Sequence, residues 1–244
     1  MLPIRDLNPS RRTPFFTYLI ILACVVIFFA VQTGEEQIYQ AASIPCEVTT
    51  GDPLSSAEMF GGPCGTGDSP VFPEKNIWFS VIASIFFHGG IGHLLSNLWV
   101  LFIFGNNIED AFGHLPYSVF YLAAGVVASG AHILLQPQST LPVVGASGAI
   151  AGVMGAYAVL FPRARVTAIV PPFFFWPFAL PAMLFLAIWF FSQFLLAGGG
   201  TNIAWEAHVA GFVFGVLVAL VARRSLRTHS TAIEMRVPVG RLHS

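Results

Sequence analysis

The chain has 244 residues, of which 55% are hydrophobic and only 9% are charged. A soluble domain carries about 25% charged residues, so this composition argues against a water-soluble protein and indicates that lipid surrounds much of the chain. The formal net charge of −1 argues against a nucleic-acid partner.

The apolar stretches predict six transmembrane helices. About 20 helical residues cross the ~30 Å hydrocarbon core of a bilayer, and six stretches reach or approach that length. The first follows Arg11 and Arg12, and we interpret it as an uncleaved helix because no convincing small-residue cleavage site follows it. The predicted fold class is therefore all-α, a polytopic membrane helical bundle. The predicted spans are residues 15–31, about 90–112, 116–135, 147–161, about 181–197 and 203–222.

Two further apolar stretches do not qualify as spans. Residues 77–88 are too short, and we expect them to lie in the membrane surface. Residues 166–180 are interrupted by three prolines, and we expect an interfacial segment that leads into the fifth helix. The chain is thus divided into an N-terminal segment (1–14), a six-helix membrane domain (15–222) whose long first loop is 34–89, and a basic tail (223–244).

The basic residues gather on one side of the predicted bundle. Six spans place both termini on the same side, and ten of the eleven Lys and Arg residues then fall there, with Lys75 alone on the other. Basic residues mark the cytoplasmic side of a membrane protein. We therefore predict a multi-pass protein of the cell membrane with both termini in the cytoplasm. The first loop is then extracytoplasmic, and the tail is expected to be flexible and close to anionic lipid.

Two of the three cysteines share the first loop. Cys24 lies in the first span and is interpreted as a small core residue. Cys46 and Cys64 would pair as a disulfide if the first loop faces an oxidising space. Two free thiols are an equal alternative.

The fourth predicted span is short, and its first residue is Ser147. Fifteen helical residues extend about 22 Å, which is less than the membrane core. Residues 136–146 must therefore dip into the membrane, and irregular backbone at that depth is tolerated only in protein or beside a water-filled cavity. The sequence thus predicts a wet pit with Ser147 at its floor. The N–H groups of the helix start would favour an oxyanion there, whereas a plain N-cap serine is the structural alternative.

A histidine in the last span is predicted at the same depth as Ser147. His208 would reach hydrogen-bonding distance of Ser147 if the fourth and sixth spans packed closely, and a neutral imidazole can remove a hydroxyl proton. A histidine that merely bonds a backbone carbonyl is the alternative. Stripes of small residues predict the close packing. They are Gly148, Ala151, Gly152 and Gly155 on the fourth span, and Gly211 and Gly215 on the last.

The outer end of the second span carries a second polar pair. His93 and Asn97 are four residues apart on one helix face. Side-chain donors here could bind a developing oxyanion, or could form an interhelical hydrogen-bond pair that only holds the bundle together. We find no Asp or Glu at this depth of a span, and Glu206 is expected to point to a different helix face from His208. The pattern therefore predicts a dyad, not a triad.

These three groups, in their order along the chain, resemble the rhomboid family of intramembrane serine proteases over residues 78–224. The segment GASG is similar to the family's nucleophile motif and puts Ser147 in the place of the nucleophile. The segment AHVAGFVFG is similar to its histidine motif, with His208 as general base. The segment HGGIGHLLSNLWVLFIFG resembles its second-helix motif, in which His93 and Asn97 would support the oxyanion and the earlier His88 would be structural.

The resemblance implies an endopeptidase that cuts single-span transmembrane proteins in lipid, with no metal or organic cofactor. Family members often carry an aromatic residue one turn after the serine, stacked on the histidine. Here Ala151 occupies that place, so His208 needs another support. The alternative function is a non-proteolytic rhomboid-like protein that binds or escorts membrane clients, but the presence of both Ser147 and His208 favours the enzyme. The sequence specifies no oligomeric state.

Overall fold

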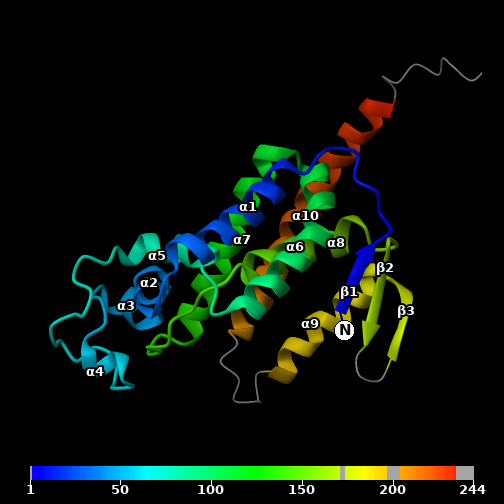
Figure 1. Cartoon of the computed structure of the whole chain (residues 1–244). Helices are drawn as coiled ribbons and strands as arrows, with labels where there is room; N and C mark the ends of the chain where they lie inside the picture. The colour runs from blue at the N-terminus through cyan, green and yellow to red at the C-terminus, as the bar shows by residue number, and fades with distance from the viewer. Residues whose placement is uncertain (1, 171–173, 197–203, 235–244) are drawn as a thin grey trace, which may run out of the picture.

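The computed structural model describes residues 2–170, 174–196 and 204–234. Long helices dominate it, with a small sheet at one end (Figure 1), so the predicted all-α class is confirmed in the main. The long helices are α1 (Phe15–Val26, continued by a π-helical turn, Ile27–Val31), α6 (Ile91–Phe112), α7 (His114–Leu135), α8 (Ser147–Leu160), α9 (Ala182–Leu196) and α10 (Trp205–Glu234).

Helix α10 continues well beyond the predicted end of the last span at Ala222 and reaches Glu234. The first part of the basic tail is therefore helical, and its expected flexibility and contact with anionic lipid stay predictions. The segment from Ala222 to Glu234 contains neither glycine nor proline, the two residues that most disfavour a helix interior.

The surface of the helices fits a lipid environment. Three described helices are long and apolar enough to cross a membrane, namely α6, α7 and the part Trp205–Arg223 of α10. The shorter apolar helices among the described residues are Phe15–Val31, Ile77–Phe86, Ser147–Leu160 and Ala182–Leu195. Large apolar side chains on these helices face outward, such as Leu134 and Val221, which are 82% and 83% exposed. Many exposed large apolar side chains on long helices are typical of a protein that contacts lipid.

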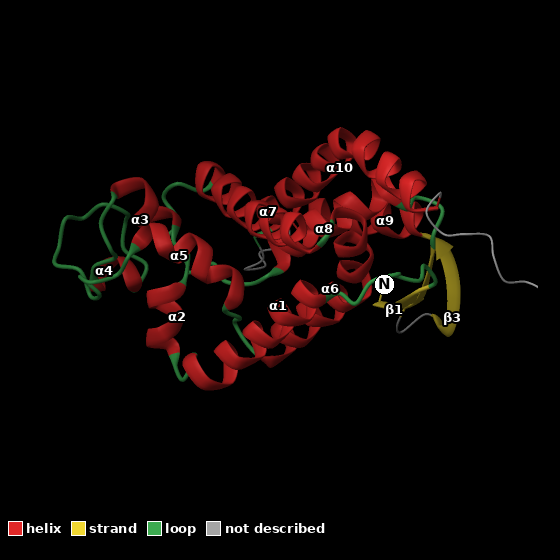
Figure 2. Ribbon diagram, turned by 90° about the horizontal axis from the view of Figure 1, so that it is seen from above, coloured by secondary structure: helices red, strands yellow, loops and turns green. Residues whose placement is uncertain are grey.

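Helix α8 lies at the centre of the bundle, and most of its side chains are buried. It packs mainly against α10 and α7 (Figures 1 and 2). The contact with α10 is made by backbone: a Cβ atom on Gly211 would overlap the carbonyl oxygen of Gly148, and one on Gly215 would overlap that of Gly152. The predicted close packing of small residues is therefore present, and no side chain larger than hydrogen fits at these positions.

A three-stranded antiparallel sheet joins two distant parts of the chain. It consists of β1 (Leu2–Asp6), β2 (Arg165–Val170) and β3 (Phe174–Pro181), in that order. The expected interfacial lead-in over residues 166–180 is thus a β-structure where it is described. Four of the six residues of β2 are β-branched, which suits a strand, and the prolines of β3 are tolerated because that strand is at the edge.

Side chains of the bundle hold the N-terminal strand in place. The indole N–H of Trp99 donates to the carbonyl oxygen of Pro3 at 2.7 Å. The carboxylate of Asp6 accepts hydrogen bonds from the hydroxyl of Tyr157 at 2.8 Å and from the amide of Asn107 at 2.6 Å. In both views the sheet lies at the opposite end of the bundle from the first loop (Figures 1 and 2). The chain before α1 and the connection from α8 to α9 therefore share one side.

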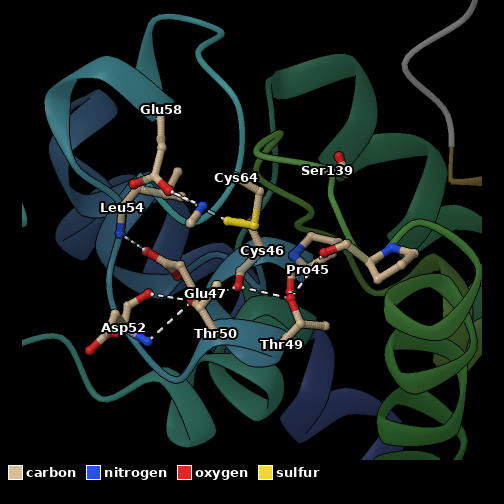
Figure 3. Close-up of a disulfide and its surroundings, with 12 residues drawn as sticks. Pro45, Cys46, Glu47, Thr49, Thr50, Asp52, Leu54, Glu58, Cys64 and Ser139 are labelled. Carbon is tan, nitrogen blue, oxygen red and sulfur yellow. Dashed lines mark hydrogen bonds between the residues drawn. A yellow bond between two sulfur atoms is a disulfide. The ribbon is translucent and has the colours of Figure 1, made fainter. Parts of the chain in front are cut away.

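The first loop folds into a small helical unit, which we call the first-loop unit. Its helices are α2 (Glu35–Ala41), α3 (Pro45–Thr50), α4 (Ser56–Met59) and α5 (Ile77–Ala83), followed by a 3-10 turn, Ser84–Phe86. Cys46 and Cys64 form a disulfide (Figure 3), which decides the question that the sequence left open. Cys24 is free and buried in α1, as predicted.

Buried charges complete the first-loop unit. The carboxylate of Glu58 accepts hydrogen bonds from the backbone N–H groups of Ser55 and Gly65. Burial by itself would raise the pKa of Glu58, but these hydrogen bonds outweigh it and lower the pKa below its usual range. The ammonium group of Lys75 forms a buried ion pair with Glu47. Lys75 is the one basic residue that the sequence analysis placed on the predicted outer side, and the structure pairs it with Glu47.

The first-loop unit contacts the segment 136–145 that leads to Ser147. The backbone N–H of Cys46 donates to the carbonyl oxygen of Ser139 at 2.9 Å, and Ser43 forms an isolated β-bridge with Val143. At its end, the N–H of Gly145 donates to the carbonyl oxygen of Ser84 at 2.9 Å. Irregular backbone before α8 is thus paired with protein, as burial requires.

We predict that Gly215→Ala lowers the free energy of unfolding by about 1–3 kcal/mol, because the added methyl group must push α8 and α10 apart. Thermal unfolding in detergent micelles would measure the effect. Gly130→Ala is the matched control, since Gly130 lies inside α7 and a Cβ there meets no atom within 4 Å. Alanine should stabilise that position by up to about 1 kcal/mol. Equal stability of the two variants would contradict the packing described here.

A second prediction concerns the disulfide. Its two cysteines are 18 residues apart in the chain, and closing a loop of this size stabilises a fold by about 3 kcal/mol. Reduction should therefore raise the rate at which a Glu-specific protease cleaves at Glu58 on the order of 100-fold. A Cys24→Ser variant should respond to reductant like the native chain, whereas Cys46→Ser/Cys64→Ser should be cleaved rapidly without it. An unchanged cleavage rate on reduction would show that the disulfide does not stabilise this unit.

Candidate active site

Helices α8 and α10 bring Ser147 and His208 into direct contact. Ser147 is the first residue of α8, and His208 lies in the first turn of α10. The Nε2 atom of His208 is 2.7 Å from the Oγ atom of Ser147, which is hydrogen-bonding distance. This distance follows from the backbone contact between Gly148 and Gly211, because Gly148 follows the serine and Gly211 is one turn after the histidine.

Ser147 is not the N-cap of its helix. Ala146 occupies that place, and no side chain of the described chain caps α8. The hydroxyl of Ser147 contacts the imidazole instead. The start of α8 therefore presents backbone N–H groups without a side-chain cap beside a serine hydroxyl, and such N–H groups attract negative charge.

His93 lies against the backbone that precedes Ser147. Gly145 has φ +133°, and a Cβ atom there would be only 2.6 Å from Cε1 and 2.8 Å from Nε2 of His93. The backbone N–H of Gly89 donates to Nδ1 of His93 at 3.3 Å. Because Nδ1 accepts this hydrogen bond, the neutral ring carries its proton on Nε2, the atom beside Gly145. His93 thus offers an N–H donor close to the backbone that precedes Ser147.

Asn97 lies one turn further along α6. Its side-chain amide donates to the carbonyl oxygen of His93 at 3.0 Å, and 6% of the residue is exposed. Within the described residues, the hydrogen bonds of both side chains are local to 89–97, so the pair does not bridge two helices. One amide hydrogen of Asn97 remains available to the cavity that it lines.

A cavity of about 490 Å³ lies in front of these side chains. Its volume is in the range of small-molecule and peptide sites. Polar groups line one part of the wall, and apolar residues of several helices line the rest. The residues that line it include Gly89, His93, Asn97, Val100, Ala128, Val144, Ser147, Met154, Trp189 and His208.

Two residues of α9 support His208, and the sequence analysis missed both. The Oε1 atom of Gln193 is 2.8 Å from Nδ1 of His208. The ring of Trp189 lies beside the imidazole, with 6.0 Å between ring centroids. These contacts supply what Ala151 does not. A glutamine inside an apolar span is a signal that could have been followed, but the helix face that it occupies depends on packing.

Two other ionisable residues near the site have structural partners. Glu206 accepts a hydrogen bond from Gln136 at 3.0 Å and lies 3.3 Å from Nδ1 of His132, so it faces α7 and not His208. This agrees with the predicted direction of Glu206. His88 is fully buried, and its ring meets that of His93 edge to face, with 5.3 Å between centroids. Neither ring nitrogen of His88 has a hydrogen-bond partner among the described residues, so its contact with His93 is one of ring packing.

The described residues offer no metal site at this cavity. The one group of three His, Cys, Asp or Glu side chains that is close enough to share an ion in the described chain is Cys46, Glu58 and Cys64. Both sulfur atoms of that group are bonded to each other, so neither is a free ligand. The polar side chains that line the cavity include those of Ser147, His208, His93 and Asn97.

The chain matches the family model described as Rhomboid domain over residues 75–225. Rhomboid protease GluP of Bacillus subtilis (strain 168) is 29% identical to it over 150 residues, which are 59% of this chain and 24% of GluP. Rhomboid protein 1, mitochondrial, of Saccharomyces cerevisiae is 28% identical over 147 residues, 57% of this chain and 40% of that protein. RHOMBOID-like protein 12, mitochondrial, of Arabidopsis thaliana is 34% identical over 150 residues, 54% of this chain and 43% of that protein.

The chain thus spans less than half the length of each of these three relatives. The family match, in contrast, covers more than half of the chain and includes α6 to α9, the described part of α10 up to its residue 225, and both Ser147 and His208. The chain is therefore a multi-pass helical membrane protein that belongs to the rhomboid family.

Proposed function

We propose that this protein is an intramembrane serine endopeptidase that cuts transmembrane substrates with Ser147 and His208. The contact of 2.7 Å between Ser147 Oγ and His208 Nε2 carries the proposal. Ser147 Oγ attacks the scissile carbonyl carbon while His208 Nε2 takes the hydroxyl proton. The tetrahedral intermediate collapses to an acyl-enzyme, and His208 gives the proton to the leaving amine. Water then repeats the sequence and releases the second product.

The negative oxygen of the intermediate is held by neutral donors. The backbone N–H of Ser147 lies at the start of α8, where the helix dipole is positive. The Nε2–H of His93 and the unused amide hydrogen of Asn97 are the side-chain donors. Donors fixed in advance in a site that excludes bulk water stabilise an oxyanion strongly, typically by about 3–4 kcal/mol for each one.

The substrate is a single-span membrane protein that enters from the lipid between α6 and α9. Support comes from the walls of the cavity, because Asn97 and Val100 of α6 and Trp189 of α9 line it together with the dyad. A helical segment has its carbonyl groups hydrogen-bonded, so the substrate must be extended or unwound where Ser147 attacks. Residues with low helix propensity near the outer end of the substrate helix favour cleavage.

The topology that accompanies this function has six spans, both termini in the cytoplasm and the first loop outside, in the cell membrane. The sheet supports it, because β1 and β2 lie on one side and are separated by the four long helices α1, α6, α7 and α8. The disulfide of the first-loop unit favours an oxidising compartment for that side, because disulfides form and persist there. The basic residues favour the cytoplasm for the opposite side.

Cleavage of a single-span model substrate in liposomes tests the proposal. The native chain should cut it, and Ser147→Ala and His208→Ala should each lower kcat on the order of 10⁴-fold or more, because each removes one half of the dyad. Cys24→Ser, in the buried core of α1, is the control for handling and folding. Cleavage that survives Ser147→Ala would refute the mechanism. A native chain that binds several substrates without cutting them would favour the client-binding function instead.

A further prediction concerns the oxyanion side of the site. Gly145→Ala should lower kcat/KM by about 100-fold, because the methyl group meets the His93 ring and the left-handed φ disfavours alanine. The rate at which a fluorophosphonate labels Ser147 would fall in parallel. Gly89→Ala is the matched control, since its nearest contact is Nδ1 of His93 at an ordinary 3.8 Å and its N–H is kept. Equal loss in both variants would show that the His93 ring position is not what matters.

A further inference from the structure

The two nitrogen atoms of His208 face different partners. Nε2 is 2.7 Å from Ser147 Oγ, and Nδ1 is 2.8 Å from Gln193 Oε1. A neutral imidazole carries one proton, and the nitrogen without it is the base. For Nε2 to accept the serine proton, Nδ1 must be the protonated atom. The group beside Nδ1 therefore decides whether the dyad is ready to react.

An amide side chain can present either an acceptor or a donor to Nδ1, so the orientation of Gln193 matters. Its Nε2 atom donates to the carbonyl oxygen of Trp189 at 3.1 Å and to the hydroxyl of Ser192 at 3.3 Å. That hydroxyl in turn donates to the same carbonyl at 2.6 Å. Both amide hydrogens are thus used within α9. A flipped amide would place its oxygen against the Trp189 carbonyl oxygen, two acceptors without a proton between them.

The environment makes this orientation strongly preferred. Gln193 is only 4% exposed, so water does not replace a lost partner. A buried donor or acceptor without a hydrogen bond is unfavourable, and the flipped amide would lose both of its donor contacts within α9. With the His208 proton on Nδ1, the hydrogen bonds would all run in one direction, from Ser147 to His208, from His208 to Gln193, and from Gln193 to the backbone of α9. Such chains strengthen each of their members.

We infer that Gln193 is a positioning residue that holds the proton of His208 on Nδ1 and leaves Nε2 free to accept the proton of Ser147. This inference rests on the proposed proteolytic function and assigns to a neutral amide the orienting part that an aspartate has in a triad. Trp189 packs on the ring and limits its rotation. Gln193 itself is not among the described residues that line the cavity, so we expect it to act through His208 and not on the substrate directly.

Two substitutions separate this role from simple packing. Gln193→Met keeps the size of the side chain and removes the acceptor, so kcat should fall about 10- to 100-fold while KM stays unchanged. Gln193→Glu in its neutral acid form keeps a carbonyl oxygen for His208 and an O–H donor for the Trp189 carbonyl. It should retain kcat within about fivefold of the native value. A purely structural role gives the reverse order, because methionine suits a buried apolar site and a glutamic acid does not.

The relative kcat of the two variants therefore distinguishes a positioning role from simple packing. Thermal unfolding checks that both variants are folded. Gln193→Glu active and Gln193→Met impaired would support the inference. Native activity in Gln193→Met would overturn it, as would equal loss in both folded variants.

The protonation of His208 can also be observed without any cleavage assay. Proton–nitrogen correlation spectra of the chain with ¹⁵N-labelled histidine distinguish the two tautomers, and the His208 signal is the one missing in His208→Ala. The native chain should show Nδ1–H, and Gln193→Met should show a mixture or Nε2–H. A native chain that cleaves substrate with Nε2–H on His208 would overturn the inference. A native chain that shows Nδ1–H but cleaves nothing would count against the proposed proteolysis and leave the hydrogen-bond assignment standing.

Discussion

Direct contact between the backbones of α8 and α10 is the constraint on which the rest of the molecule depends. In lipid the apolar surfaces of two helices gain little from meeting each other, so the helices associate through close packing. Glycine at positions 148, 152, 211 and 215 permits that approach, and any Cβ on Gly211 or Gly215 would overlap a carbonyl oxygen of α8. Because Ser147 and His208 stand directly beside this contact, the same glycines set the distance between the hydroxyl and the imidazole.

The irregular backbone before α8 places Ser147 and must itself be stabilised inside the membrane. This segment carries polar groups to the level of Ser147, and each needs a partner where lipid offers none. The first-loop unit supplies partners at Ser139 and Val143, and the 3-10 turn supplies one for Gly145. The disulfide and the buried carboxylate of Glu58 stabilise that unit from within. Parts of the chain far from the dyad in sequence thus support the residues that precede the serine.

The site uses neutral groups throughout. Among the described residues around the dyad, the partners are a serine, two histidines and two amides, whereas Glu206 is directed to α7. An unpaired carboxylate in a low-dielectric environment is strongly unfavourable, and a neutral amide avoids that cost. A glutamine can orient an imidazole only if its own orientation is determined, and the backbone of α9 does this. The rotation of α9 about its own axis thus matters for the proposed chemistry, because it decides whether the neutral amide of Gln193 faces His208.

The sequence by itself determined the long helices and the order of the polar residues along them. The length of a span and the spacing of its small residues are visible in the sequence of each single helix. Ser147, His208, His93 and Asn97 could therefore be selected without a structure. Tertiary structure alone decided the pairing of Leu2–Asp6 with Arg165–Val170, the Cys46–Cys64 disulfide and the contact of Gln193 with His208. Each of these depends on how separate segments are placed and rotated against one another. No window of sequence contains that information, because the partners are brought together only by the packed bundle.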